Sequence, residues 1–579
     1  MVICGIKTTH DSAIALIDNG KLIFSYEYEK LNNNNRYESM KDGIDIQLLE
    51  SILSEYEYSV ADIDQIVIDG WATFLDESQD YDYPAYHVPV KINGAEEVRI
   101  GFARYGMRVK DENLLERSTF NYPELNLSYS SYMHVSGHVM SAYCTSPFAA
   151  ENKASFVLSW DGGMCPQLFY IDPVSKKTEN LGPVFTLLGS MYEAFANAYP
   201  PFNSYAISDL SIAGKVMAYI AKGNCNHEVL KECKSLFALQ EGQLSETENY
   251  TSQYIKGVTN KLLAEIVAYG EMNDIEPLDM MATFHVFIQE ILIAQLALKI
   301  KQYPTLVNNL CFVGGSALNI KWNSAIRNSG LFKEMWIPPF PNDSGSAIGT
   351  ACCEMIVATG RFALDWNVYS GPKISKGTID HAWEVSECTI ADLAFLLHET
   401  NEAVVFLNDR AELGPRALGN RSILAAPVKP EMKTELNRLK GRENYRPVAP
   451  ICLEEDAPAI FSPGSTDPLM LYDHQVKEEW LEKIPAICHL DGSARLQTVN
   501  STDNPIIYEL LTQYKALSGV PLLCNTSANF NGKGFFPNVS SAVQWGETNM
   551  VWSDHQLFFR SESPISDFIR KKIYYSEII

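Results

Sequence analysis

The chain begins with short apolar runs that are separated by polar turns. Two runs occupy residues 2–6 and 12–17, and a third, at 21–26, follows the turn Asp18-Asn19-Gly20. Asn and Gly tolerate the positive φ angles of a tight two-residue turn, so an Asn-Gly step between strand-like runs is typical of a β-hairpin. The pattern therefore predicts a hairpin near the amino terminus.

Further strand-like runs follow, and stretches with helical periodicity separate them. In the first two thirds of the chain they lie at 65–69, 155–161, 167–171 and 310–313. In the last third they lie at 403–407, 422–426, 448–453 and 521–525. Strands that alternate with helices indicate an α/β fold.

A connector interrupts this pattern. Between about Gly360 and Thr378 the periodicity is lost, and Gly, Pro and Ser are frequent, as in a linker. With 579 residues, the chain is also too long for one core, since single cores stop growing at about 250–300 residues. We therefore expect two domains, at residues 1–365 and 378–579.

Composition and cysteine usage indicate a cytoplasmic protein. The longest apolar helix candidate, Met280–Ile300, is interrupted by His285, Gln289, Glu290 and Gln295. The amino terminus lacks the long apolar segment of an export signal. The twelve cysteines form no CxxC pair and no framework spacing, which favours reduced thiols over disulfides or zinc. We expect neither export nor a membrane span.

A basic cluster stands out against the acidic charge of the chain. The formal net charge is −25, which disfavours non-specific binding of nucleic acid. Residues 406–450 nevertheless hold Arg410, Arg416, Arg421, Lys440, Arg442 and Arg446. Guanidinium forks, above all those of Arg416, Arg421 and Arg446, suit bidentate phosphate binding, and neighbouring glycines let backbone N–H groups approach. The alternative, a solvated charged surface, fits less well because Leu, Pro, Ala and Ile lie between the arginines.

Two other motifs carry candidate chemistry. His134 and His138 are four residues apart, which places both imidazoles on one face of a helix, where they can bind one metal ion or serve only in packing or capping. Asp161-Gly162-Gly163 ends a strand and can approach phosphate or a metal-bound water without a side-chain clash. The alternative for this second motif is an ordinary hairpin turn.

Sequence blocks along the whole chain resemble one family. They are HDSAIAL at 10–16, HVSGH at 134–138, SWDGG at 159–163, GGSALNIKWN at 314–323, PFPNDSGSAIGTA at 339–351, GPRALGNRSI at 414–423, RENYRPVAP at 442–450, DGSARLQTV at 491–499 and LLCNTSAN at 522–529. In this order, they resemble the carbamoyltransferases of antibiotic and nodulation-factor biosynthesis.

The resemblance implies a fold and an activity. The fold is α/β, with a duplicated domain like those of actin, Hsp70 and sugar kinases, followed by a YrdC-like α/β domain. The activity is ATP-dependent O-carbamoyl transfer. The carboxy-terminal domain converts carbamoyl phosphate and ATP, with Mg(II), into carbamoyladenylate, which passes directly to the amino-terminal domain for transfer to a hydroxyl group.

The resemblance also implies roles for individual residues. Asp343 completes a metal site with His134 and His138 that suits Fe(II) first, and also Mn(II) or Zn(II). His10, Asp11 and Asp161 are catalytic candidates, although His10 and Asp11 could equally cap the adjoining segment. The predicted carbamoyl phosphate and ATP site consists of Arg416, Lys440, Arg446, Arg495, Asn525 and Ser527. The predicted nucleotide and phosphate loops contain Gly162, Gly163, Gly314, Gly315 and Asn319.

The sequence leaves the acceptor open. A small hydroxylated metabolite or a hydroxymethylated nucleoside or nucleotide is the favoured acceptor, and a hydroxymethylated base in DNA is the alternative. A sugar-kinase-like phosphotransferase is less favoured, because it leaves the arginine-rich domain without a role. Where the family reads GEGKVMGLAPYG, this chain has SIAGKVMAYIAKGN at 211–224, so acceptor specificity can differ. The oligomeric state is also open, a homodimer being one option.

Overall fold

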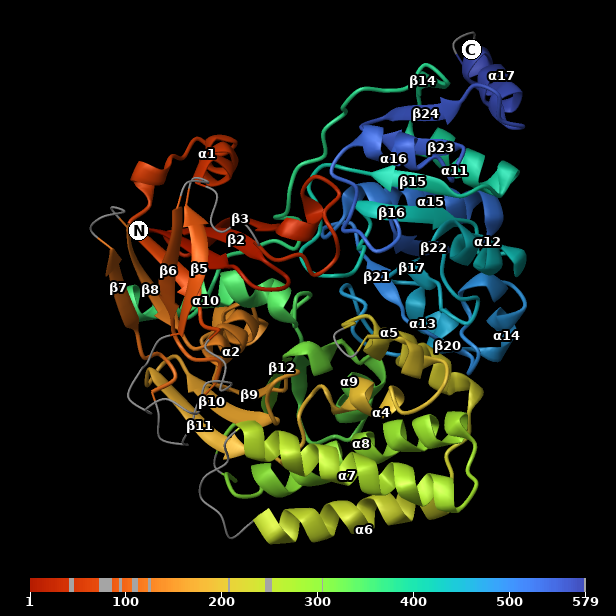
Figure 1. The fold of residues 1–579 in the computed structure, drawn as a ribbon. Coiled ribbons are helices and arrows are strands. Elements are labelled where there is room, and N and C mark those ends of the chain that lie inside the picture. Colours follow the sequence, from red (N-terminus) through yellow and green to blue (C-terminus); the bar gives the residue numbers. More distant parts are fainter. Residues whose placement is uncertain are drawn as a thin grey trace. The chain divides into compact units, whose positions relative to one another are not determined.

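The structure, a computed structural model, divides into two units. It describes residues 1–40, 46–71, 86–92, 96–106, 113–122, 127–206, 209–244, 252–304 and 306–576. The first unit comprises residues 1–28 and 37–367, and the second comprises residues 29–36 and 368–579 (Figure 1). The predicted connector at 360–378 thus contains the division between residues 367 and 368, whereas the predicted domain bounds gave no sign that residues 29–36 belong to the second unit.

The first unit contains two sheets that share one topology over five strands, and the first sheet has one further edge strand. The first has the order β3-β2-β1-β4-β8-β7. Its strands are β1 (Val2–Lys7), β2 (Ala13–Asp18), β3 (Lys21–Glu27), β4 (Gln65–Asp69), β7 (Ser118–Tyr122) and β8 (Leu127–Tyr132). The second has the order β11-β10-β9-β12-β13. Its strands are β9 (Ser155–Ser159), β10 (Gln167–Asp172), β11 (Lys177–Pro183), β12 (Asn309–Val313) and β13 (Glu334–Trp336).

The strand directions repeat as well. In each sheet, two antiparallel pairings join the first three consecutive strands, and the first of these strands then pairs in parallel with a later strand. A further parallel neighbour follows in both sheets. The predicted hairpin between β2 and β3 is confirmed, with φ of 48° at Asn19 and 82° at Gly20. The first unit is therefore built on a duplicated sheet. A separate hairpin is formed by β5 (Tyr86–Ile92) and β6 (Glu96–Phe102).

Helices connect and cover these sheets. They are α1 (Ile46–Ser54), α2 (His134–Cys144), α3 (Pro147–Ala150), α4 (Met191–Ala196), α5 (Ile212–Tyr219), α6 (His227–Leu244), α7 (Ser252–Met272), α8 (Pro277–Ile300), α9 (Ile320–Asn328) and α10 (Ser346–Thr359). Helices α6, α7 and α8 lie side by side (Figure 1). By length and composition α8 could cross a membrane, but 56% of its most apolar window is buried. That burial is typical of a core helix.

Helices α2 and α10 cross at very short range, at a pair of glycines. A Cβ atom on Gly349 of α10 would lie 1.9 Å from the carbonyl oxygen of Gly137 of α2. Only glycine at position 349 leaves room for this approach. The crossing matters because α2 begins with His134, and Asp343 lies just before α10.

We expect Gly349→Ala to destabilise the first unit by about 3 kcal/mol or more, because the backbones of α2 and α10 must separate. Urea denaturation followed by circular dichroism measures the effect. Gly257→Ala in α7 is the matched control, since a Cβ there meets nothing within 4 Å; it should be neutral or slightly stabilising. Equal stability of the two variants would contradict the importance of the crossing.

The second unit has an eight-stranded mixed sheet of order β14-β24-β23-β15-β16-β22-β17-β21. The strands are β14 (Trp383–Glu387), β15 (Val404–Leu407), β16 (Arg421–Ala425), β17 (Ala449–Leu453), β21 (Gln497–Val499), β22 (Leu522–Ser527), β23 (Met550–Ser553) and β24 (Gln556–Arg560). A small sheet contains β18 (Phe461–Ser462), β19 (His474–Val476) and β20 (Ser493–Ala494). The four strand-like runs predicted in this region coincide with β15, β16, β17 and β22 to within two residues.

The helices of this unit are α11 (Ile390–Thr400), α12 (Glu431–Leu439), α13 (Ala457–Ile460), α14 (Glu478–Leu481), α15 (Pro505–Ser518), α16 (Val539–Trp545) and α17 (Ser566–Ser576). Helices α11 and α15 pack against each other. Their buried leucines and isoleucines form one apolar core with the side chains of the large sheet. A single core thus supports the loops that follow β16 and β22.

Residues 29–36 are fixed within the second unit by hydrogen bonds. The buried Lys30 ammonium donates to the carbonyl oxygens of Glu412 and Gly414, at 2.6 and 2.8 Å. The backbone N–H of Gly534 donates to the carbonyl of Asn34 at 3.0 Å. A Cβ on Gly534 would lie 1.9 Å from the carbonyl oxygen of Glu29. The segment therefore belongs to the framework of the second unit, and no local sequence pattern could reveal this because the contacts are long-range.

Candidate functional site

The first group of candidate residues lies around the beginning of α2. His134 and His138 are fully buried, with ring centroids 4.5 Å apart. Asp343 Oδ1 lies 3.4 Å from Nε2 of His134 and 3.3 Å from Nε2 of His138. Asp161, just after β9, completes the group. The structure thus brings together the three predicted metal ligands and one predicted catalytic carboxylate.

These four side chains fit a divalent metal ion. One ligand atom from each lies within 4.8 Å of the others, which is close to the limit of about 4.4 Å for two ligand atoms that each lie about 2.0–2.2 Å from a shared ion. Within the described part of the chain, the buried Nε2 atoms of both histidines have no hydrogen-bond partner, and a bound cation would satisfy both. Imidazole and carboxylate ligands suit Fe(II), Mn(II) or Zn(II), and this geometry does not select among them.

Two residues that we did not single out from the sequence hold this group in place. Nδ1 of His134 lies 2.7 Å from Oδ2 of Asp69, so it can donate to that carboxylate and leave Nε2 for a metal. The buried Lys7 ammonium lies 3.3 Å from Asp69 Oδ2 and 3.0 Å from Asp343 Oδ2. Asp343 therefore presents Oδ1 to the histidines while Lys7 holds Oδ2.

The charges in this buried group are strongly coupled. Burial opposes the charge of His134, but Asp69 and Asp343 raise its pKa to about 9. Burial likewise opposes the charge of Asp343, yet Lys7 and His134 hold its pKa well below the usual range. In both cases the neighbouring opposite charges outweigh desolvation.

Strand pairing explains how Lys7 and Asp69 could have been found. The parallel pairing of β1 with β4 matches Ile6 with Ile68, so the next residue of each strand, Lys7 and Asp69, projects at the same edge of the sheet. The required signal was therefore the pairing of two predicted strands, which a single sequence does not specify.

Asp161 connects the metal-binding group to the glycine loops. Its Oδ1 accepts the backbone N–H of Gly315 at 2.8 Å, and its Oδ2 accepts the hydroxyl of Tyr105. A Cβ on Gly314, where φ is 94°, would lie 2.3 Å from the carbonyl oxygen of Trp160, so this loop requires glycine. Tyr105 was not predicted.

The other loop residues have distinct environments. A Cβ on Gly162 would meet nothing within 4 Å, whereas one on Gly163 would lie 3.1 Å from the Tyr105 ring. The side-chain oxygen of Asn319 accepts backbone N–H groups of Lys321 and Trp322 and thereby caps α9. The structure thus gives Asn319 a helix-capping role, and its predicted nucleotide contact stays a prediction.

His10 and Asp11 lie beside the metal-binding group. His10 Nδ1 is 2.9 Å from Asp11 Oδ2, and its Nε2 is 3.5 Å from Asp343 Oδ2. Asp11 Oδ1 accepts the amide of Asn342 at 3.2 Å. Burial opposes the charge of His10, but Asp343 and Asp11 raise its pKa. The His10 side chain is 36% exposed, so a solute can reach it, in contrast to the buried His134 and His138.

The second group of candidate residues is a cationic cluster in the second unit. We define it as Arg36, Arg416, Lys440, Arg442, Arg446 and Arg495, because the charges of these residues act on one another. Burial and then Arg446 lower the pKa of Arg495 to about 10. Burial, Arg446 and Arg495 lower that of Arg442 to about 9. Arg416 and Lys440 are buried and the other four are half-buried, and cations that repel one another in this way favour a bound anion.

The end of β22 supplies polar groups to the same unit. The buried Asn525 amide donates to the carbonyl of Ala417 at 3.1 Å and to Gln497 Oε1 at 3.0 Å. Its Oδ1 atom is buried and has no hydrogen-bond partner within the residues that the structure describes. Asn525 therefore offers one acceptor to a ligand that carries N–H groups.

Two predicted phosphate contacts differ in the structure. The Arg421 guanidinium, 1% exposed, donates to the carbonyls of Asn408, Asn420, Pro372 and Asp409 at 2.6–3.0 Å. Its interpretation as a phosphate fork is wrong, because its donors are engaged by backbone. Lys440 Nζ donates to the carbonyl of Ser527 at 2.7 Å and to both oxygens of Asn529. Lys440 thus contributes charge to the cluster while it fixes the loop after β22.

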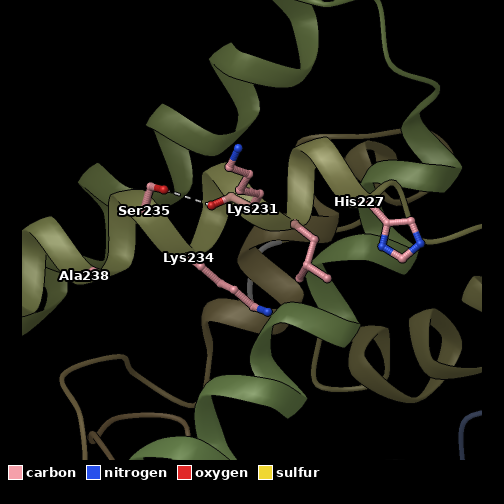
Figure 2. A pocket seen from close by; sticks show the side chains of 6 residues that line it. His227, Lys231, Lys234, Ser235 and Ala238 are labelled. Atoms are coloured by element: carbon pink, nitrogen blue, oxygen red, sulfur yellow. Dashed lines mark hydrogen bonds between the residues drawn. The ribbon is translucent and has the colours of Figure 1, made fainter.

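A surface hollow on α6 contains none of the predicted site residues. It is lined by His227, Leu230, Lys231, Lys234, Ser235 and Ala238 (Figure 2). Ser235 Oγ donates to the carbonyl of Lys231 at 3.1 Å, and Lys234 forms an ion pair with Glu290 of α8. These contacts are those of an ordinary helix surface.

Comparison with known proteins gives consistent matches along the chain. Residues 2–352 match the model "Carbamoyltransferase N-terminus", and residues 395–552 match "Carbamoyltransferase C-terminus". Nodulation protein U of Rhizobium tropici is 44% identical, over 96% of this chain and 96% of that protein. The 3'-hydroxymethylcephem-O-carbamoyltransferase of Streptomyces clavuligerus is 31% identical, over 94% of this chain and 96% of that protein.

Among solved structures, the activator of 2-hydroxyisocaproyl-CoA dehydratase from Clostridium difficile is similar at 13% identity. The match has a TM-score of 0.29 and covers 61% of this chain and 93% of that chain. A TM-score of this size supports no conclusion about fold or ligands.

Proposed function

Because the chain belongs to the carbamoyltransferase family, we propose that it transfers a carbamoyl group from carbamoyl phosphate to a hydroxyl group in two ATP-dependent steps. The second unit forms carbamoyladenylate, and the first unit transfers its carbamoyl group. The observation that supports this division most directly is that the first unit holds a metal-binding group, whereas the second holds a cationic cluster.

We also assign a fold class to each of the two units from the family resemblance and the strand order. Five strands of each sheet in the first unit follow the same order, as expected for the duplicated actin, Hsp70 and sugar-kinase class. The YrdC-like assignment of the second unit rests on the resemblance of its motifs. We also expect carbamoyl transfer in the cytoplasm, on the family resemblance and on the cysteine spacing, which favours reduced thiols.

The first step needs a site for several anionic oxygens. Carbamate is a poor electrophile, because its nitrogen lone pair deactivates the carbonyl, so the group must be joined to a good leaving group. Water takes the phosphoryl group of carbamoyl phosphate, and the carbamate oxygen then attacks the α-phosphorus of ATP and expels pyrophosphate. Arg416, Arg446 and Arg495 bind the phosphate oxygens. Asn525 Oδ1 accepts a hydrogen bond from the carbamoyl NH2 group.

The second step uses the group around α2. A divalent ion held by His134, His138 and Asp343, with Asp161 beside it, would act as a Lewis acid for anionic oxygens. Lys7 and Asp69 orient the ligands. His10 donates from Nδ1 to Asp11, which leaves its Nε2 to take the proton of the acceptor hydroxyl. A small hydroxylated molecule is the acceptor that we favour.

The product nucleotide tests this scheme. With carbamoyl phosphate, ATP and Mg(II), we expect AMP, pyrophosphate and a carbamoylated small hydroxylated molecule, identified by mass spectrometry from a panel of metabolites and hydroxymethyl nucleotides. Formation of ADP with a phosphorylated acceptor would indicate a kinase instead. Carbamoyl transfer to hydroxymethylated DNA, with binding that weakens steeply with salt, would overturn the choice of a small acceptor and leave the two steps intact.

A further inference from the structure

We propose that Trp71 is a positioning residue of the metal-binding group, because its indole face holds the Lys7 ammonium in place beside a bound divalent cation. This inference rests on the proposed function, since it adds a residue to the site of the second step. Trp71 follows Gly70 directly after β4 and is half-buried. An indole offers neither a metal ligand nor an acid–base group, so its contribution must come from its ring.

Close backbone packing fixes the place of Trp71. A Cβ atom on Gly70 would lie 2.4 Å from the carbonyl oxygen of Tyr132 and 2.7 Å from that of Arg104, so the chain can pass here only as glycine. The backbone N–H of His134 donates to the same Arg104 carbonyl at 3.0 Å. The end of β4 and the start of α2 are thus tied to one segment, which brings Trp71 beside His134.

The Trp71 ring contacts four side chains of the site. Its centre lies 5.0 Å from the ring centre of His10, 5.2 Å from that of His134 and 5.3 Å from that of Tyr105, with interplanar angles of 85°, 79° and 72°. Such edge contacts between rings are favourable. The fourth neighbour is the Lys7 ammonium, 4.1 Å from the ring centre. A cation in this position is attracted by the negative charge of the ring face.

The other contacts of Lys7 explain why its position matters. Its ammonium donates to Thr9 Oγ1 at 2.7 Å and to Asp69 Oδ2 at 3.3 Å, and it lies 3.0 Å from Asp343 Oδ2. These three oxygens match the three N–H groups of an ammonium, and Lys7 is only 1% exposed. The Trp71 face covers a further side. Together these contacts keep Lys7 on Oδ2 of Asp343, which leaves Oδ1 for the metal.

A bound divalent cation changes the forces on Lys7. It draws on the negative charge of Asp343 and repels the nearby ammonium. The Trp71 face is not shared with the metal, so Lys7 depends on this face more in the metal-bound protein than in the metal-free protein. An interaction that is stronger in the bound state raises the affinity for the ligand. A weaker negative charge on the Trp71 face should therefore weaken metal binding.

The test measures the affinity of the full-length, metal-stripped protein for Mn(II) alone, from the electron paramagnetic resonance signal of free Mn(II). Tryptophan with four fluorine atoms on its six-membered ring, placed only at position 71 by nonsense suppression, keeps the ring and removes the negative charge of its face. We expect it to raise Kd by about threefold to tenfold, within the range of a desolvated cation–π contact. Trp71→Leu should raise Kd by about tenfold or more, and Trp71→Phe should restore part of the affinity.

Trp336 provides the matched control. It lies in β13 of the same unit, is also half-buried, and has an aromatic neighbour, Trp366, at 6.3 Å between ring centres. It does not belong to the metal-binding group. Fluorinated tryptophan at position 336, or Trp336→Leu, should leave Kd within about twofold of wild type, as expected for a site that shares no partner with the metal-binding group.

Each outcome decides the role of Trp71. Equal or tighter Mn(II) binding with fluorinated tryptophan at position 71 would overturn the role, even if Trp71→Leu weakens binding, because that pattern is expected of a ring that only fills space. If Trp71→Leu does not fold, the fluorinated protein decides alone, since its ring is kept. Absence of Mn(II) binding by the wild-type protein would overturn this role together with the metal site of the proposed function.

Discussion

Arg495→Ala is expected to lower carbamoyl phosphate-dependent pyrophosphate release by about 100-fold to 1,000-fold, the range seen when one donor to a developing anion is removed. Arg495 lies in the cationic cluster, and burial together with Arg446 disfavours its charge unless an anion is present. Its buried Nε atom has no hydrogen-bond partner in the described ranges. The measurement is an enzyme-coupled pyrophosphate assay, with Arg438→Ala as a surface control that should retain activity.

A second variant, in the first unit, tests whether the two proposed steps are separate. His138→Ala should release pyrophosphate at a rate close to wild type and lose carbamoylated product, because His138 belongs to the metal-binding group and not to the cationic cluster. Complete loss of pyrophosphate release in a folded His138→Ala protein would show that the two steps are not divided between the units as we propose.

The second large effect concerns metal content. Asp343→Ala should weaken metal binding by at least about 100-fold, more than the loss expected for a supporting residue. The change removes the Oδ1 atom that faces both histidines. Elemental analysis after dialysis against trace metal measures occupancy directly and independently of activity.

The controls for this variant address charge and folding. Asp172→Ala removes a carboxylate from a surface turn, where Asp172 bonds Ser175, and should keep full occupancy. Asp343→Ala also leaves Lys7 with Asp69 as its remaining carboxylate neighbour, so circular dichroism must show that the first unit is folded. Full metal occupancy in folded Asp343→Ala would discard Asp343 as a ligand.

Local sequence patterns predicted local structure well. The Asn19-Gly20 step identified the hairpin of β2 and β3, because positive φ at both residues is a property of those residues themselves. The spacing of His134 and His138 placed both on one face of α2, since helix periodicity is fixed. The addition of Asp343 to this pair came from the resemblance, because no local pattern connects residues so far apart in sequence.

Long-range contacts explain what the sequence could not predict. Lys7 and Asp69 meet only because β1 pairs with β4, and Tyr105 reaches Asp161 from a different part of the chain. Arg421 was misinterpreted because an arginine in a basic run carries no mark of its direction, and here its donors bind backbone carbonyls. Arg36 was missed because its neighbours in space are residues of the second unit.

The segment at residues 29–36 also restricts where the chain can be divided into two fragments. The chain enters the second unit directly after Tyr28, leaves it at Tyr37, and enters again after Asn367. A single break between residues 367 and 368 would separate the carboxy-terminal fragment from the donors of Lys30 and from Arg36. Expressed alone, residues 368–579 would therefore lack part of the framework of the second unit, and adding residues 29–36 would be needed to restore it.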